Sequence, residues 1–442
     1  MKFLLVQNTT FVPTLGGANK ANRALMEQLA ANGHSCMVIA PGVSKVQGIA
    51  SRERFTEELD ARGIQAISSA QADTFFSNQV EVHALVSNAF FRNVMKEKIQ
   101  AFQPDLILVS SEDPAQVLLA TALELSRKVI YICHTTLALP FGPDCAYESK
   151  AQKELLQKAA AVITVSEYLK DYLSRWGGIS SEVISFPVYG NIKGSNVADF
   201  DKGYVTMINP SSIKGISIFT SLAERFPMHS FAAVPTWATT AQDLAVLRNV
   251  PNVTILEPRD NVSEIFERSK VLLVPSLWGE AFGQVAVEAM LHGIPVLSSD
   301  VGGLKEAKLG VSYSIPVVPI KEYTEQFDDR MIPIPVVPEQ PLEQWEQSLQ
   351  ELLESRKHYQ EVSVQSHAAA KKFVEQIHIG TFETVFMHLN ERLSDTATEI
   401  EVDAEGSVNG SGSVSRLPSN LSADKKDLLM ARLLEKMRSN KY

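Results

Sequence analysis

Short apolar runs alternate with amphipathic stretches along most of the chain, a pattern typical of a parallel sheet covered by helices. The apolar runs predict two groups of strands, at residues 3–6, 36–40, 106–110, 129–133 and 159–165, and at residues 204–208, 253–256, 271–274 and 296–298. The amphipathic stretches predict helices at residues 18–32, 88–102, 115–125, 284–291, 342–354, 356–376 and 382–393. Two groups of strands, each alternating with helices, indicate an α/β protein with two Rossmann-like domains.

The length of the chain also favours more than one domain, because 442 residues exceed what a single core normally holds. A turn-rich segment at 186–202 predicts a linker between an N-terminal domain at 1–185 and a C-terminal domain at 203–378. The last predicted helix, at 382–393, is expected to form a separate unit at 379–394 after the C-terminal domain. Residues 311–341 are rich in proline and predict a loop of unusual length.

Charge and cysteine content narrow the possible partners and the compartment. The net charge of −10 gives no electrostatic reason to expect nucleic acid as a partner. Cys36, Cys133 and Cys145 lack the spacing of a disulfide pair or a metal site, which favours a reducing cytoplasm. The first apolar run is too short for a signal peptide, and no stretch reaches the length of a membrane span. We therefore predict a cytoplasmic protein and leave peripheral contact with a membrane open.

The segment 271–297 carries the most informative chemistry, since it predicts a strand, a loop, a helix and a second strand. Gly279 and Gly283 bracket the loop, so its backbone N–H groups can come close to a ligand. Seven residues separate Glu280 in the loop from Glu288 on the helix. The N–H groups at a helix N-terminus suit a phosphate, and we expect the carboxylates to face uncharged sugar hydroxyls. The alternative is an ordinary strand–helix–strand unit in which Glu288 is a solvated helix residue.

The order of residues in this segment resembles the donor site of retaining GT-B glycosyltransferases of family four. The shared pattern is P-S-x-x-x-E-x-F-G-x-x-x-x-E-A-M-x-x-G-x-P-V over residues 275–296, with G-G-L-x-E at 302–306. The resemblance implies that Glu280 contacts the transferred sugar and that Glu288 holds the nucleotide ribose. It also implies a final helix that crosses back onto the N-terminal domain, and a diphosphate-binding loop formed by Phe282, Gly283 and Gln284.

Two features of the N-terminal domain match the same family. Gly16 and Gly17 stand between the first strand and the first helix, in an opening that resembles the family's P-x-x-G-G-A and lacks the dinucleotide fingerprint G-x-G-x-x-G. The resemblance implies that this loop approaches the donor diphosphate and the acceptor across the cleft. His134 follows the strand at 129–133, where open parallel sheets bind ligands, and matches the family's histidine near the reacting sugar. A purely structural histidine is the alternative.

The loop after the strand at 204–208 resembles the phosphate clamp of the family. Lys214 precedes a glycine, as in the family, so its ammonium is expected on the donor phosphates, where it stabilises the leaving nucleotide. Asn209 stands where the family usually has an arginine, which leaves the clamp one cation short. Arg259, after the strand at 253–256, is a hypothetical replacement.

A second candidate for diphosphate binding is a D-x-D pair, Asp199 and Asp201. Metal-dependent glycosyltransferases of another fold hold a diphosphate with this pattern. Because both residues lie in the predicted linker, we interpret them as solvated and predict no metal.

The C-terminal 48 residues have a different character. Residues 395–420 are rich in acidic, glycine and serine residues and predict a flexible linker, and residues 421–440 predict a leucine-striped amphipathic helix. This helix resembles the short helices that precede modules of peptide synthetases and polyketide synthases. The resemblance implies docking to a biosynthetic partner protein and an acceptor made by such an assembly line. Packing onto this chain itself, or self-association, is the alternative.

Together these features predict a retaining glycosyltransferase that uses a nucleoside-diphosphate sugar and needs neither a metal nor another cofactor. The acceptor stays open among a small molecule, a peptide and a lipid, and UDP or GDP is the favoured nucleotide. Alternatives are a catalytically weakened scaffold that acts through its tail helix, and a sugar phosphorylase or epimerase of the same fold. The expected catalytic residues are Glu280, His134 and Lys214, and the expected donor-binding residues are Gly16, Gly17, Asn209, Lys214, Arg259, Phe282, Gly283, Gln284 and Glu288.

Overall fold

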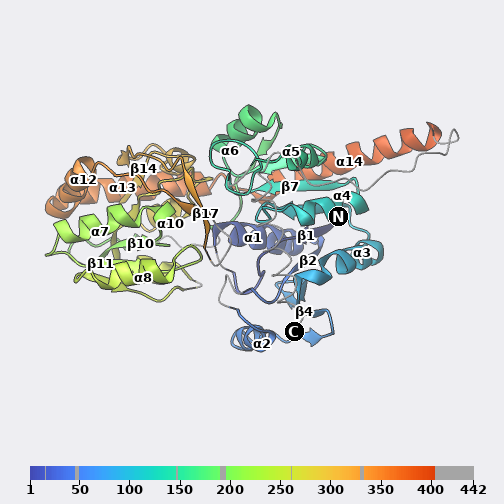
Figure 1. Cartoon of the computed structure of the whole chain (residues 1–442), viewed down its shortest axis with the longest axis horizontal. Coiled ribbons are helices and arrows are strands. Elements are labelled where there is room, and N and C mark those ends of the chain that lie inside the picture. The colour runs from blue at the N-terminus through green and yellow to red at the C-terminus, as the bar shows by residue number, and fades with distance from the viewer. Residues whose placement is uncertain are drawn as a thin grey trace.

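The structure is a computed structural model, and it describes residues 1–14, 16–44, 49–145, 148–189, 196–259, 261–328 and 333–403. It contains two lobes, each built around a largely parallel sheet with helices on both faces (Figure 1). The predicted α/β fold with two Rossmann-like domains is confirmed. All strands of the first sheet precede the predicted linker and all strands of the second follow it, although the exact domain boundaries stay a prediction.

The N-terminal sheet has nine strands in the order β3-β4-β5-β2-β1-β6-β7-β8-β9. Neighbouring strands from β5 to β9 pair in parallel, and β4 joins its neighbours antiparallel. The parallel strands are almost wholly apolar, as expected for strands buried on both faces. Their bounds are β1 (Lys2–Val6), β2 (Ser35–Pro41), β3 (Ile67–Ser68), β4 (Ala72–Ser77), β5 (Val80–Leu85), β6 (Leu106–Ser110), β7 (Val129–Cys133), β8 (Ala161–Thr164) and β9 (Glu182–Val183).

The helices of this domain connect the parallel strands and cover the sheet (Figure 1). Serine side chains cap several of them, including Ser51, Ser149 and Ser166, each of which accepts a hydrogen bond from a backbone N–H three residues on. The helices are α1 (Gly17–Ala31), α2 (Arg52–Asp60), η2 (Asn88–Phe90), α3 (Phe91–Phe102), α4 (Val117–Leu125), α5 (Lys150–Leu156), α6 (Glu167–Tyr172) and η3 (Leu173–Gly177).

The C-terminal sheet has six parallel strands in the order β12-β11-β10-β13-β14-β15. Its strands are β10 (Tyr204–Ile208), β11 (Phe231–Val234), β12 (Val253–Ile255), β13 (Ser269–Val274), β14 (Val296–Ser299) and β15 (Ser314–Ile315). Its helices are η4 (Ser212–Lys214), α7 (Ile216–Arg225), α8 (Ala241–Arg248), α9 (Ser263–Phe266), α10 (Gln284–Leu291), α11 (Leu304–Ala307), α12 (Glu343–Glu354) and α13 (Arg356–Val374). The order places β10 and β13 side by side at the centre, so the loops that follow them meet at one edge.

The proline-rich segment predicted as a loop at 311–341 contains ordered structure. After β15, the strands β16 (Tyr323–Phe327) and β17 (Pro333–Pro335) form an antiparallel hairpin. β17 lies between the two lobes (Figure 1). The sequence analysis did not predict this hairpin because proline has no N–H to donate a hydrogen bond to a neighbouring strand, so prolines argue against a strand.

The last described helix, α14 (Ile379–Asp403), crosses from the C-terminal lobe onto the N-terminal one, as the family resemblance implied (Figure 1). Phe386 packs on Phe3 of β1, with ring centroids 5.2 Å apart, and Asn32 donates a hydrogen bond to the Glu383 carboxylate at 2.9 Å. The helix runs to Asp403, whereas we predicted a flexible linker from residue 395. The rest of that linker and the predicted docking helix at 421–440 lie outside the described residues.

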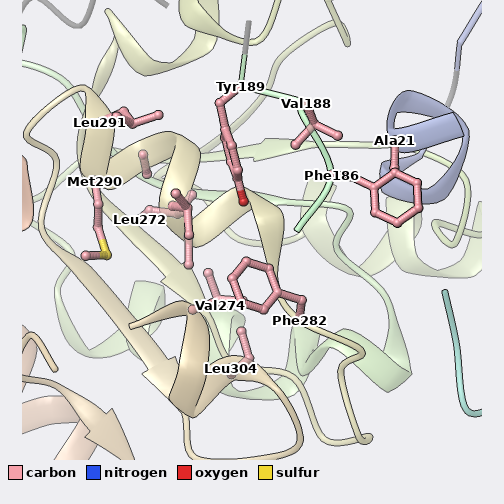
Figure 2. Packing of buried hydrophobic residues seen from close by; sticks show 14 of the residues in the cluster. Ala21, Phe186, Val188, Tyr189, Leu272, Val274, Phe282, Met290, Leu291 and Leu304 are labelled. Atoms are coloured by element: carbon pink, nitrogen blue, oxygen red, sulfur yellow. The ribbon is translucent and has the colours of Figure 1, made fainter. Parts of the chain in front are cut away.

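One hydrophobic cluster runs through both lobes and the chain that joins them. Figure 2 shows part of it, with Ala21 of α1 near Phe186 of the linker, and Tyr189 close to Phe282 and β13. Because the two lobes share this buried core, they are held together by apolar packing as well as by the linker. None of the helices within the described ranges is long and apolar enough to span a bilayer.

A buried lysine in the second lobe offers a test of its packing. Lys308, directly after α11, is 2 % exposed and donates a hydrogen bond to the Val296 carbonyl of β14. Burial lowers the pKa of Lys308 from 10.5 to about 7. The unfolded chain therefore binds more protons between these pH values, so this residue makes folding more favourable as the pH rises, by at most about 1.4 kcal/mol per pH unit.

We predict that Lys308→Met raises the free energy of unfolding at pH 7, because no ammonium is then buried. The variant should also lack the contribution of Lys308 to the rise of the free energy of unfolding with pH. Urea denaturation of both proteins at pH 7 and pH 9 measures the effect. The difference between variant and wild type should shrink as the pH rises. A difference that is the same at both pH values would contradict the burial of Lys308.

Candidate functional site

The loop after β10 places Lys214 at the carboxyl edge of the second sheet. Gly215, which ends η4, has φ 80°, a left-handed conformation that favours glycine. A Cβ on Gly215 would lie 1.9 Å from the Pro275 carbonyl oxygen, so only glycine allows the loops after β10 and β13 to pack this closely. This close packing brings Lys214 onto the loop that carries Glu280.

Lys214 and Glu280 form a buried ion pair with 2.5 Å between Nζ and Oε1. The Ser276 hydroxyl donates a further hydrogen bond to the same carboxylate oxygen. Burial alone would raise the pKa of Glu280, but the Lys214 charge and the two hydrogen bonds together hold that pKa below its ordinary value. Glu280 is therefore ionised at neutral pH and can accept hydrogen bonds from hydroxyl groups.

Two tryptophans surround the ammonium of Lys214. Its Nζ lies 4.8 Å from the ring centroid of Trp278 and 5.8 Å from that of Trp237. Both distances fall within the range of cation–π attraction. The two rings thus restrict the conformations of the lysine side chain, which suits a group that must contact a phosphate at a fixed position.

The N-terminus of α10 lies opposite the glycine loop of the first domain. A Cβ on Gly17 would lie 2.9 Å from Gln284 Oε1, and one on Gly16 would lie 3.4 Å from Trp237. Gln284 Oε1 is buried and has no hydrogen-bond partner among the described residues. The first N–H groups of an α-helix lack the usual acceptor, and at α10 the Ala286 N–H donates instead to the Gly283 carbonyl at 2.9 Å.

Phe282 lies in the predicted diphosphate-binding loop, and its side chain packs into the core. Its ring is buried and stacks on Phe373 of α13, with centroids 5.7 Å apart. The side chain therefore anchors the loop in the core, as Figure 2 also shows, and only its backbone can face a diphosphate. Gly283 follows with φ 103° as the N-cap of α10.

Glu288 lies one turn into α10 and is buried. Its carboxylate forms an ion pair with Lys20, which lies on the first turn of α1 in the other domain. The pair joins the two lobes across the cleft. The structure thus brings both carboxylates of the motif to the edge where the domains meet, each with a lysine partner.

Further hydrogen bonds connect the loop 279–281 to the N-terminal domain. Ser166 donates to the Ala281 carbonyl at 2.5 Å, and Thr136 lies 3.4 Å from the Gly279 carbonyl. Glu306 of α11 accepts hydrogen bonds from the backbone N–H groups of residues 167 and 168, at 2.9 and 2.8 Å. Glu306 thereby caps α6 from the opposite lobe.

His134 stands at the end of β7 within a polar network. Its Nε2 lies 2.8 Å from Asn22 Oδ1, and its backbone N–H donates to Ser111 at 2.8 Å. Because an amide oxygen can only accept, Nε2 carries the proton and Nδ1 remains an acceptor. Burial lowers the pKa of His134 to about 3, so the imidazole is neutral at physiological pH.

The same network contains a carboxyl group that the sequence analysis missed. Glu112, directly after β6, accepts hydrogen bonds from Ser110 and Ser111, and Asn22 donates to Ser110 at 2.8 Å. Burial raises the pKa of Glu112 above its ordinary value despite these hydrogen bonds. A position at the carboxyl end of a parallel strand was the signal that could have identified it.

The two remaining donor-site predictions have different surroundings. Asn209 is buried at φ 64°, and its Oδ1 accepts the Ala238 N–H at 2.9 Å, so it is a fixed structural element of the loop. Arg259 is more than half exposed, and its only ion-pair partner among the described residues is Glu264, at 3.6 Å. The structure gives no contact that would make Arg259 the missing cation.

The D-x-D pair lies where a linker interpretation expects it. Asp201 is exposed and forms an ion pair with Arg356 at 2.5 Å. This pair ties the linker to the start of α13.

Two sequence models of known families match most of the two domains. The family described as Glycosyltransferase Family 4 matches residues 15–188, and the family described as Glycosyl transferases group 1 matches residues 218–332. Among curated proteins, an uncharacterized 42.6 kDa protein in the cps region of Klebsiella pneumoniae is 23 % identical over 369 residues, which cover 76 % of this chain and 93 % of that protein. D-inositol 3-phosphate glycosyltransferase of Mycobacteroides abscessus is 42 % identical over 72 residues, which cover 16 % of each chain.

Several solved structures have a similar fold. Sucrose-phosphate synthase from Thermosynechococcus elongatus superposes with a TM-score of 0.60 at 15 % identity and covers 91 % of this chain and 100 % of that one. Anabaena Alr3699/HepE in complex with UDP and glucose gives a TM-score of 0.58 at 16 % identity and covers 90 % of this chain and 100 % of that one.

The Lys214–Glu280 pair leads to a prediction about stability. Lys214→Met should lower the free energy of unfolding by roughly 3–5 kcal/mol, because it leaves the Glu280 carboxylate buried without a countercharge. The double variant Lys214→Met/Glu280→Gln should be more stable than Lys214→Met alone. Urea denaturation of the wild type, both single variants and the double variant gives the coupling energy. Additive effects of the two substitutions would contradict a direct ion pair.

Proposed function

We propose that this chain, which belongs to the family-four glycosyltransferases of GT-B fold, transfers a sugar from a nucleoside-diphosphate sugar to an acceptor with retention of configuration. The observation that carries the proposal is the pair of Glu280 and Lys214 beside the N-terminus of α10. An ionised carboxylate suits sugar hydroxyls, and the ammonium and helix N–H groups suit a diphosphate. These groups lie at the carboxyl edge of the second sheet, where open α/β sheets bind ligands.

The proposed reaction breaks the bond between the anomeric carbon and the phosphate oxygen and forms a bond from that carbon to an acceptor hydroxyl on the same face. The acceptor proton passes to the leaving phosphate oxygen. In this scheme Lys214 stabilises the charge that develops on the diphosphate, while Glu280 orients the sugar hydroxyls. We propose that neither step requires a metal.

The acceptor would bind on the side of the first domain. His134 is neutral there and presents Nδ1 as an acceptor for a sugar or acceptor hydroxyl. Glu112 adds a carboxyl group to the same network. We therefore propose that both contact the hydroxyl-bearing substrates and that neither forms a covalent bond to the sugar.

The nucleotide is proposed to be UDP, because Anabaena Alr3699/HepE has been crystallised with UDP-glucose. The predicted peptide or polyketide acceptor depends on the helix at 421–440, which lies outside the described residues, so it stays a prediction. The alternative of a catalytically weakened scaffold is supported by Asn209, because this residue is uncharged where the family usually has an arginine. A sugar phosphorylase or an epimerase would give different products in the assay that follows.

We predict that Glu280→Gln lowers the rate of sugar transfer or donor hydrolysis by about 100-fold or more, because the neutral amide no longer accepts and orients the sugar hydroxyls. Purified protein and isotope-labelled UDP-, GDP- and ADP-sugars provide the measurement. The affinity for the free nucleoside diphosphate should not fall, since Glu280 is expected to contact only the sugar.

Glu154→Gln on α5 is a suitable control, because Glu154 is an exposed carboxylate that pairs only loosely with Lys150, at 3.8 Å. It should leave the rate unchanged. A wild-type protein that binds a nucleotide-sugar and never turns it over would support the scaffold alternative. Release of a sugar phosphate would indicate a phosphorylase, and interconversion of the sugar without release of nucleotide would indicate an epimerase.

A further inference from the structure

Lys20 contributes a charge to the donor site from the opposite domain. It lies three residues after Gly17, on the first turn of α1, and its Nζ contacts Glu288 Oε1. The Lys20 side chain is 36 % exposed, whereas that of Glu288 is 7 % exposed. One partner of the pair is thus a partly exposed cation, and the other is a largely buried carboxylate.

The C-terminal domain by itself supplies little positive charge for a diphosphate. Lys214 is already paired with Glu280, Asn209 is uncharged, and Arg259 pairs with Glu264 on an exposed loop. A nucleoside diphosphate brings several negative charges that need cations or N–H groups. The described residues of this domain therefore leave room for a second cation.

The position of Lys20 fits that second cation. Glu288 lies four residues after Gln284, the first residue of α10, so the backbone of the residue that Lys20 contacts lies about 6 Å along the helix from its N-terminus. A lysine has four rotatable methylene groups and behaves as a mobile point charge, so its head group can cover this distance without movement of the backbone.

We propose that Lys20 is a donor-binding residue that exchanges partners when the nucleotide binds. Without a ligand it neutralises Glu288. When the ribose hydroxyls donate hydrogen bonds to Glu288, the ammonium of Lys20 turns to the diphosphate at the N-terminus of α10. This inference rests on the proposed function and adds to it a phosphate-binding residue from the other domain.

The exchange has a physical reason in the cost of buried charge. An unpaired carboxylate in a buried position is strongly unfavourable, so Glu288 needs Lys20 as long as the site is empty. Two ribose hydroxyls donate hydrogen bonds to the Glu288 carboxylate in place of Lys20. The released ammonium of Lys20 then pairs with the phosphates, which are more accessible to it than the carboxylate. Because α1 belongs to the N-terminal domain, the same exchange ties nucleotide binding to the contact between the lobes.

A competing role for Lys20 predicts the opposite sign. If Lys20 only blocks Glu288, its removal frees the ribose site, so both a nucleoside and its diphosphate should bind more tightly. If Lys20 binds the diphosphate, its removal should weaken the diphosphate selectively. The comparison of a nucleoside with its diphosphate therefore separates the two roles.

The test uses full-length protein and isothermal titration calorimetry. UDP, GDP and ADP are screened first, and the diphosphate that binds is compared with its nucleoside. Lys20→Gln should weaken binding of the diphosphate by about 10- to 100-fold, while binding of the nucleoside changes by less than about threefold. Lys20→Arg should keep most of the affinity for the diphosphate. Lys150→Gln, at an exposed lysine of α5, should change neither affinity.

Equal or tighter binding of the diphosphate by Lys20→Gln would overturn the inference. If Lys20→Gln does not fold, the double variant Lys20→Gln/Glu288→Gln is compared with Glu288→Gln, because both lack the unpaired carboxylate, and the same selective loss is expected. A wild-type protein that binds none of the three diphosphates would overturn the proposed function itself. If the wild type binds one of the diphosphates, and Lys20→Gln does not selectively weaken binding of that diphosphate, only the proposed role of Lys20 is overturned.

Discussion

Two buried carboxylates, Glu280 and Glu288, set the main electrostatic constraint on this molecule. Each lies at the edge where the lobes meet, and each is unfavourable there without a cation. Lys214 meets this need from within the second domain and Lys20 meets it from the first. Lys214 and Lys20 thus stabilise the fold at the place where we propose that a nucleotide-sugar binds, so the proposed binding chemistry uses the same atoms as folding does.

The supporting structure keeps these four side chains in place. Close packing at Gly215 joins the loops after β10 and β13, and stacking of Phe282 on Phe373 fixes the start of α10. On the other side, Ser166 and Glu306 join α6 to the loops around Glu280. The edge where the lobes meet is therefore supported by backbone and side-chain contacts of residues other than these four charged side chains.

Much of this arrangement follows from local sequence, because it depends on short-range patterns. The unit β13–α10–β14 matches its prediction closely, since buried strands and glycine-bounded helices have clear signatures. Lys214 and Glu280 could be named because each stands in a short motif that resembles the family pattern. Lys20 could not, because its partner is 268 residues away and the contact exists only when the lobes are in place.

Other features stayed hidden for comparable reasons. Strand β4 carries a buried Asp73, which pairs with Arg52 and accepts a hydrogen bond from Ser68, so the apolar and polar positions of this strand do not alternate in the way that predicts a strand. The hairpin of β16 and β17 was predicted as a loop because β17 begins and ends with proline. Trp237 and Trp278 come from separate loops, and their common position around one ammonium is a property of the three-dimensional fold.

The path of α14 has a consequence for how the protein comes to be folded as it is made. Phe386 near the end of the chain covers Phe3 in its first strand, so the ribosome must release almost the whole polypeptide before the earliest segment is sealed. Until then, that strand exposes apolar surface to solvent or to a chaperone. The nascent N-terminal lobe is thus an incomplete unit until α14 has been synthesised.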